Sequence, residues 1–271
     1  MTIINQKTTN LKWWRGALNG TSFIVLSMLS VANGLTNNFI AWSADAGPFP
    51  LTPIILLALF SIVVVHASEK TTPHSLFVPI AILVICVLVP SSLFSWIGIL
   101  FAALAYRKQT GSFNGEVMLL VMLALSFLWR DSLFKITSGF ILNAETWLIG
   151  VTLSPFFPEL SVYKNHLLLS EAHNLSIGVG CSVFSNLSLV ILGWMSIYYL
   201  LGYRKMNVLW FVCILAVLIV TNIVRIGLMS IDYQTYVLVH EGVGATVYNT
   251  FLILVSASPL ILSFFNIKGD V

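Results

Sequence analysis

A chain of 271 residues in which 58% are hydrophobic and only 8% are charged cannot cover its own surface in water. Soluble domains carry roughly a quarter charged residues, so the composition excludes an ordinary soluble protein and predicts an all-α polytopic membrane protein, with residues 1–271 forming one integral membrane domain. The formal net charge of +3 is small and gives no indication of a nucleic-acid partner.

Residues 1–130 are expected to contain five membrane-spanning helices. A span needs about 20 mainly apolar residues, and the candidate segments are 17–36, 51–67, 74–90, 92–106 and 114–130. Lys7, Lys12 and Arg15 precede the first segment, a pattern also found in cleaved signal peptides. Because many apolar segments follow, we expect a retained first helix.

Residues 131–182 are expected to form an extracytoplasmic segment. Its first part, 132–155, carries Lys135, Asn143 and Glu145 among large apolar side chains. This mixture favours an amphipathic helix that lies in the membrane interface over a further membrane span.

The end of the same segment has the pattern of a β-hairpin. Between residues 173 and 181, every second residue from Leu175 to Val179 is apolar, and this period of two is typical of a half-buried strand. The stretch 161–170 supplies a partner strand, and 171–174 reads as the turn between the two. A small extracytoplasmic hairpin is therefore expected to return the chain to the membrane surface.

Residues 183–271 are expected to add three spans, at 183–201, 207–229 and 247–266, for about eight in all. Basic residues of short loops concentrate on the cytoplasmic side. A cytoplasmic N-terminus places nine lysines and arginines inside and four outside. The sequence therefore predicts a multi-pass protein of the inner (plasma) membrane, with both termini in the cytoplasm.

This topology brings three chemically capable residues to the outer face. Cys181 precedes the sixth span, Arg225 lies near the outer end of the seventh, and His240 lies in the loop before the eighth. A thiolate is a strong nucleophile, an imidazole protonates a leaving amine, and a guanidinium stabilises an oxyanion. Together they suffice for acyl transfer from a peptide. Ser182 is a candidate helix cap beside the thiol, and Asn222 lies one turn before Arg225 on the same helical face.

Each residue also has a structural explanation. Cys181 could be a packed thiol, His240 a polar loop residue, and Arg225 a side chain that reaches the membrane interface. His166, His173 and His240 lack the spacing typical of a metal site. No metal or organic cofactor is expected.

Three local patterns follow one another in the second half of the chain: Gly180-Cys181-Ser182 after a strand-like run, the stretch 222–226 at a helix end, and His240 with Gly244 four residues later. In these patterns the sequence, over about residues 160–265, resembles the exosortase/archaeosortase family of multi-spanning membrane cysteine transpeptidases. That resemblance implies a thiol protease and transpeptidase of the cell envelope, with its active site at the extracytoplasmic face.

The resemblance implies substrates and roles as well. The substrates are secreted proteins whose C-terminal sorting signal comprises a short motif, one transmembrane helix and a basic tail, reached through the membrane lipid. Cys181 would attack the peptide carbonyl to form a thioester, and Arg225 would stabilise the oxyanion or hold the thiolate. His240 would protonate the leaving amine and then activate the acceptor, while Asn222 orients Arg225. Ser182 supports the thiol.

Two departures from the family pattern indicate a divergent subfamily: Val183 stands where a glycine is common, and Val179 where an acidic residue is frequent.

The alternative function is a non-enzymatic membrane protein, such as a small permease or an assembly subunit, with Arg225 and Glu145 along a solute path. The clustering of candidate residues near one surface weighs against it. A third reading, an enzyme acting on lipid or polysaccharide, ranks last because cysteine is an unusual nucleophile for glycosyl transfer.

Overall fold

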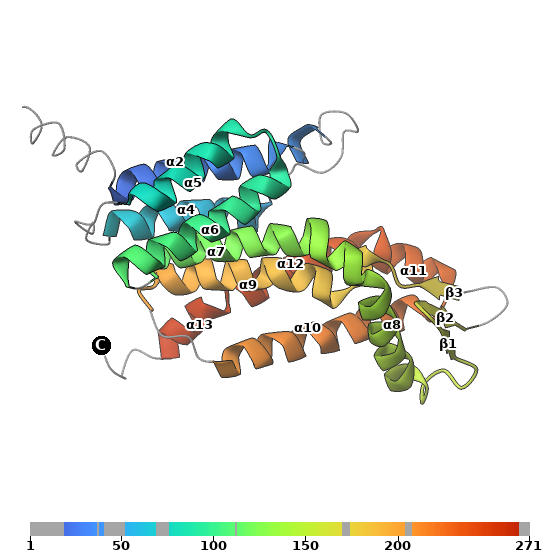
Figure 1. The fold of residues 1–271 in the computed structure, drawn as a ribbon. Helices are drawn as coiled ribbons and strands as arrows, with labels where there is room; N and C mark the ends of the chain where they lie inside the picture. The colour runs from blue at the N-terminus through green and yellow to red at the C-terminus, as the bar shows by residue number, and fades with distance from the viewer. Residues whose placement is uncertain are drawn as a thin grey trace, which may run out of the picture. The chain divides into compact units, whose positions relative to one another are not determined.

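The computed structural model describes residues 19–36, 38–40, 52–68, 76–111, 113–169, 174–203 and 208–265. These residues are predominantly helical and include one small sheet (Figure 1). It divides into two compact units, residues 1–128 and 129–271, each of which is described by itself below. Lys7, Lys12 and Arg15, expected before the first span, lie outside the described residues.

The described part of the first unit consists of helices α2 (Gly20–Gly34), α4 (Pro53–Ser68), α5 (Phe77–Leu88), α6 (Ser92–Thr110) and α7 (Gly115–Leu128). Local sequence determines where α6 begins and ends. The hydroxyl of Ser91 accepts a hydrogen bond from the Phe94 N–H at 3.4 Å, as an N-cap does. Gly111 closes the helix with a φ of +84°, a left-handed conformation that glycine adopts at little cost.

Small residues let the helices of this unit approach closely. A Cβ at Gly98 on α6 would lie 1.9 Å from the sulfur of Cys86 on α5, so a larger residue there would require the Cys86 side chain to move. Nearby, the rings of Trp96 and Phe127 stack at 4.4 Å. Close packing through small residues is characteristic of helices in membranes, and Cys86 is accordingly a buried packing residue.

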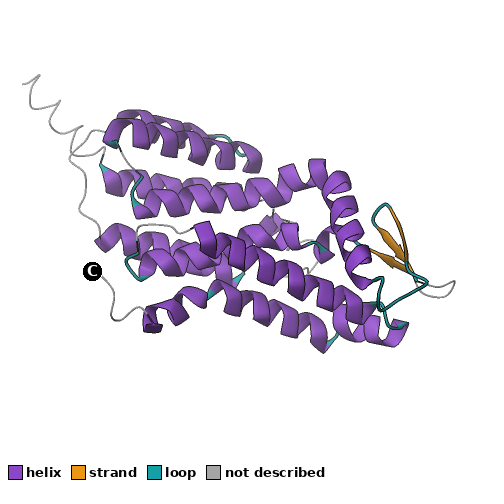
Figure 2. Ribbon diagram, turned by 90° about the horizontal axis from the view of Figure 1, so that it is seen from below, coloured by secondary structure: helices purple, strands orange, loops and turns teal. Residues whose placement is uncertain are grey.

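The second unit begins with a π-helical turn, Trp129–Leu133, and continues through α8 (Phe134–Leu153), a 3₁₀ turn at Val179–Cys181, α9 (Val183–Leu200), α10 (Val208–Met229), α11 (Tyr233–His240), α12 (Val243–Ser256) and α13 (Ser258–Phe265). Figures 1 and 2 both show α8 lying crosswise to α9 and α10, at one end of these two helices. The same end carries the sheet.

The sheet has three antiparallel strands in the order β1 (Ser161–Tyr163), β2 (His166–Leu168) and β3 (Asn174–Ser176). Leu167 pairs with Leu175, and both side chains are buried. Strands β1 and β2 pack against α8, where a Cβ at Gly150 would lie 2.2 Å from a methyl group of Val162. Residues 170–173, at the expected turn between β2 and β3, lie outside the described part of the chain, and the side of the membrane on which the sheet lies stays a prediction.

Three of the described helices, α8, α9 and α10, are long and apolar enough to cross a membrane, and α11 with α12 makes a fourth if this pair, bent by 44°, counts as one span. Each of the eight segments expected to span overlaps a helix, but the expected span at 247–266 is divided between α12 and α13. However, α2, α4, α5 and α7 are shorter apolar helices. Helices of membrane-spanning character are therefore present, while eight crossings stay a prediction.

Helix α8 meets the length and composition criterion for a span, although the sequence favoured an interfacial helix. One face packs into the unit through buried Leu142 and Ile149, whereas Ile136 and Phe140 on the other face are 81% and 82% exposed. Such a face is stable only against lipid or another apolar surface. The crosswise direction of α8 relative to α9 and α10 (Figure 2) distinguishes it from the other long helices of this unit.

Candidate functional site

The candidate nucleophile lies at the start of a helix. Cys181 is the last residue of the 3₁₀ turn that leads into α9, and it is 8% exposed. Ser182 is the N-cap of α9, and its hydroxyl accepts a hydrogen bond from the Phe184 N–H at 3.2 Å. The residues directly before the apolar run therefore fix the position of the thiol at the N-terminus of α9. Cys181 packs in an apolar cluster that includes Ile226 and Met229.

A carboxyl group from α8 completes the cap. Glu145 is 6% exposed and accepts hydrogen bonds from the Ser182 hydroxyl at 2.5 Å and from the Val183 N–H at 2.8 Å. An acidic group is favourable at a helix N-terminus, where N–H groups lack partners within the helix. A buried carboxyl group also costs free energy unless it is hydrogen-bonded. The carboxyl group of Glu145 therefore caps α9 and also receives the hydrogen bonds that its burial requires. These bonds hold α8 and α9 together beside the thiol.

Asn222 on α10 joins this cap to the nucleophile turn. Its amide nitrogen donates to the Cys181 carbonyl at 2.8 Å and to Glu145 at 3.1 Å. Its amide oxygen accepts from the hydroxyl of Tyr248, on α12, at 3.4 Å. One fully buried amide therefore ties the backbone of the candidate nucleophile to three helices, α8, α10 and α12.

Arg225 lies one turn after Asn222 on α10. The centre of its guanidinium group is 4.4 Å from the centroid of the Tyr248 ring, a cation–π contact. Its Nε atom is buried and has no hydrogen-bond partner among the described residues. A buried donor without a partner is unusual in a folded protein.

Burial and neighbouring charges change the pKa of the Cys181 thiol in opposite directions. Burial raises the pKa of its thiol, and this is the largest effect. The positive charge of Arg225 lowers the same pKa, whereas Glu145 raises it. The guanidinium group therefore favours the thiolate, the form in which a cysteine acts as a nucleophile.

His240 is the last residue of the short helix α11, rather than a loop residue as the sequence had indicated. Its ring stacks on the ring of Tyr236 with centroids 5.0 Å apart. Tyr236 and Val239, in turn, pack against the apolar cluster that contains Cys181. The His240 Nδ1 atom is buried and has no hydrogen-bond partner in the described part of the chain.

The bend between α11 and α12 fixes the end of the helix that carries His240. A Cβ at Gly242 would lie 2.9 Å from the Leu238 carbonyl oxygen, and a Cβ at Gly244 would lie 2.6 Å from the Val239 Cα. Both contacts are with backbone, which cannot move aside easily. The two glycines therefore allow the chain to fold tightly against itself directly after His240.

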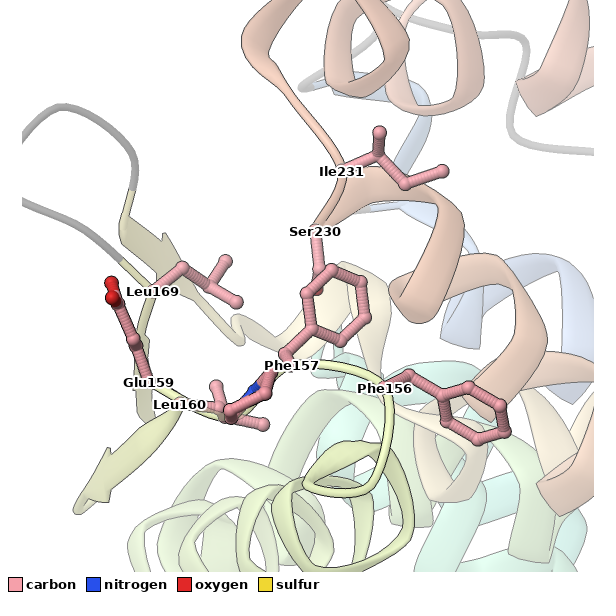
Figure 3. A pocket seen from close by; sticks show the side chains of 8 residues that line it. Phe156, Phe157, Glu159, Leu160, Leu169, Ser230 and Ile231 are labelled. Atoms are coloured by element: carbon pink, nitrogen blue, oxygen red, sulfur yellow. The ribbon is translucent and has the colours of Figure 1, made fainter.

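A cavity of about 330 Å³ with both polar and apolar walls lies in the same unit (Figure 3). It is lined by the loop after α8, including Phe157 and Leu160, by Leu169 after β2, and by Ser230 at the end of α10. In Figure 3 the ring of Phe157 lies beside Ser230. Because Phe157, Leu160 and Leu169 also pack against the cluster of Cys181, the cavity adjoins the surroundings of the thiol.

The structure thus joins Cys181, Ser182 and Asn222 by hydrogen bonds and gives Arg225 an electrostatic effect on the thiol. His240 is connected to them through the packing of Tyr236. Sequence reasoning gave Glu145 no role at the thiol and did not name the two tyrosines. The sequence feature that could have identified Glu145 is a carboxyl group within an apolar helix, because such a group usually has a partner.

Among the described residues, no group of three or more histidine, cysteine, aspartate or glutamate side chains is arranged to hold a metal ion.

No protein-family model matches the chain, and neither does any curated protein or solved structure.

Proposed function

We propose that the protein is a membrane cysteine transpeptidase and protease that cleaves C-terminal sorting signals of secreted proteins and transfers them to an acceptor. The main support is the cluster around Cys181, in which Asn222 holds the backbone of the thiol-bearing residue and Arg225 favours its thiolate. The resemblance to the exosortase/archaeosortase family agrees with this combination of residues.

The first half of the reaction forms a thioester. His240 takes the proton of the Cys181 thiol, the thiolate attacks the carbonyl carbon of the scissile peptide bond, and the carbonyl oxygen gains the negative charge. Arg225 stabilises this oxyanion with its buried Nε–H, which has no partner among the described residues. The C–N bond then breaks, and protonated His240 gives its proton to the departing amine.

The second half releases the product. Water or an amine of the acceptor attacks the thioester carbonyl, and neutral His240 removes the proton of this nucleophile. The C–S bond breaks and returns the thiolate, which Arg225 again stabilises. The protons pass between the thiol, His240, the departing amine and the incoming nucleophile, and no cofactor is invoked.

Besides the substrate protein, the lipid of the membrane is a partner of the proposed enzyme. If α9 and α10 cross the bilayer, α8 lies along its surface, with Ile136 and Phe140 toward lipid. In the predicted orientation, the sheet and Cys181 then face the extracytoplasmic side of the inner (plasma) membrane. A substrate anchored by one transmembrane helix would reach the thiol by lateral diffusion.

Processing of a co-expressed substrate tests the proposal. Secreted proteins encoded in the same genome that end in a short motif, an apolar helix and a basic tail are the substrates to use. Cys181→Ala, Arg225→Ala and His240→Ala should each abolish processing while the protein still accumulates in the membrane. The matched control is Cys213→Ala, because Cys213 is an exposed thiol elsewhere on α10. Normal processing by Cys181→Ala would reject the enzyme and favour the non-enzymatic alternative.

A further inference from the structure

Strand β3 has an unpaired edge that leads directly to the candidate nucleophile. The sheet order is β1-β2-β3, so β3 has no neighbour on its outer side within the described sheet. Two residues after Leu175, which pairs with Leu167, the Ile177 N–H donates to the Asn165 carbonyl at 2.8 Å. Hydrogen-bonded pairs alternate along antiparallel strands, so the N–H and C=O groups of Ser176 point away from β2.

The residues that carry those outward groups lie at the surface. Asn174 and Ser176 are both exposed, and Asn174 is related to Ser176 by the two-residue period of the strand, so its backbone groups face the same way. An edge of this kind offers N–H and C=O groups at the spacing of another extended chain. Lipid and polysaccharide lack that array of alternating donors and acceptors, whereas a peptide has it.

Two glycines continue this edge toward the thiol. Added Cβ atoms at Gly178 and Gly180 would meet nothing within 4 Å. Gly178 has a φ of −93° and a ψ of 176°, which any residue adopts, and neither glycine belongs to the described glycines with positive φ. Packing and backbone conformation therefore do not require glycine at either position.

Glycine is also used where another backbone or a ligand must come close. Gly178 and Gly180, each with open space at its Cβ position, follow β3 in the sequence and precede Cys181. A chain extended along the free edge of β3 would pass over both glycines before it meets the sulfur. The same two residues, each enlarged by a side chain, would hold such a chain away from the surface.

We propose that the peptide around the scissile bond of the substrate adds to β3 as a fourth strand and crosses Gly178 and Gly180 to reach Cys181. This inference deepens the proposed function and rests on it. Main-chain hydrogen bonds to Ser176 and Asn174 provide affinity in this mode of recognition, while alternate side chains of the peptide provide specificity. The sheet is thus the surface that orients an otherwise flexible substrate segment.

The first test enlarges Gly178. Gly178→Val should reduce substrate processing about tenfold or more, because a misplaced peptide loses attack geometry. The matched control is Gly139→Val, since an added Cβ at Gly139 on α8 also meets nothing within 4 Å. Alkylation of Cys181 by iodoacetamide should proceed at the unmodified rate in both variants, which shows that the site itself is intact.

The outcomes separate the two proposals. If Cys181→Ala fails to process substrate but Gly178→Val processes it normally, strand addition is wrong and the proposed enzyme stands. Normal processing by Cys181→Ala rejects the enzyme itself. If Gly178→Val alters the alkylation rate, Gly180→Ala, which adds a single methyl group, takes its place under the same criteria.

A second test detects the strand directly. Ser176→Cys is combined with Cys181→Ala, and single cysteines are placed at successive positions around the cleavage site of the co-expressed substrate. Oxidative cross-linking should join Ser176→Cys to every second substrate position, because side chains alternate along a strand. Cross-linking without this period, or only between two copies of the protein through β3, would overturn the proposal.

Discussion

Glu145 on α8 accepts a hydrogen bond of 2.5 Å from the hydroxyl of Ser182, the residue that directly follows the candidate nucleophile. The same carboxyl group accepts from the Val183 N–H and from the Asn222 amide. The crosswise helix α8 is therefore part of the support for Cys181 and not a separate surface element. Four predictions test this support, its electrostatic effect and its side of the membrane.

The first prediction concerns stability. Glu145→Ala leaves the donors of Ser182, Val183 and Asn222 without their shared acceptor in a buried place. We expect the free energy of unfolding to fall by about 2 to 4 kcal/mol, since an unsatisfied buried donor costs about 1 to 3 kcal/mol and relaxation recovers part of the sum. Thermal unfolding of the protein in detergent measures the effect. Asn143→Ala, at an exposed position of α8, is the control, and equal stabilities of the two variants would contradict the capping role.

The second prediction concerns positioning. Asn222→Leu keeps the volume of the side chain but removes its bonds to Glu145, Tyr248 and the Cys181 carbonyl. Substrate processing should fall about tenfold or more, because small displacements of a nucleophile cost up to about 100-fold in rate.

Its control is the neighbouring residue. Thr221→Ala removes a hydroxyl that donates to the Val217 carbonyl of the same helix at 2.7 Å, and it should process substrate normally. If Asn222→Leu lowers only the amount of protein, and processing per molecule is unchanged, Asn222 has no positioning role.

The third prediction concerns pH. Burial raises the pKa of the Cys181 thiol and Arg225 lowers it, so removing the guanidinium group should raise that pKa further. Because the thiolate fraction grows as pH rises through the pKa, Arg225→Gln should shift the curve of alkylation rate against pH to higher pH. At neutral pH the variant should react more slowly with iodoacetamide.

The measurement is made in a Cys86→Ala, Cys213→Ala background, so that only one thiol reacts. Arg225→Lys keeps the charge on a compact ammonium group and should show a smaller shift than Arg225→Gln. Superimposable curves for Arg225→Gln and the parent would mean that Arg225 does not act on the thiolate.

The fourth prediction concerns orientation. Tyr163 on β1 is 59% exposed, and a Tyr163→Cys thiol should react with a membrane-impermeant maleimide in intact cells. A Lys108→Cys thiol, at the exposed end of α6, should react only after permeabilisation. Both are introduced into a chain whose own three cysteines are replaced by alanine. The reverse pattern would place the sheet in the cytoplasm and remove the proposed access for secreted substrates.

Local features of the candidate site were predictable from sequence. A serine before an apolar run predicts a helix cap, and Ser182 caps α9. The alternation near residues 173 to 181 predicted a strand, and the structure has one only at Asn174–Ser176. The pairing continues only as far as Ile177, whose N–H donates to the Asn165 carbonyl at 2.8 Å. Beyond it the chain enters the 3₁₀ turn at Val179–Cys181, and on the partner side it turns at Lys164, where φ is 55°.

Non-local partners were not predictable in the same way. Glu145 lies 37 positions from Ser182 and 77 from Asn222, and nothing in local spacing links them. The polar residue in an apolar helix indicated that a partner exists, but only the fold identifies it. The two tyrosines carry no local signal, since aromatic residues are common at membrane interfaces. The sequence similarly locates apolar helices without deciding which of them cross the bilayer, because their length alone is ambiguous.

The tight bend after His240 limits which natural variants of this chain can persist. An added Cβ at Gly242 or Gly244 would clash with backbone atoms of Leu238 or Val239. Any larger residue at either position therefore requires α11 and α12 to move apart. Mutational drift is therefore restricted at two sites that take no part in the chemistry. A homologue with a bulky residue at either site would have to keep its imidazole in reach by some other route, such as a longer connection between the two helices.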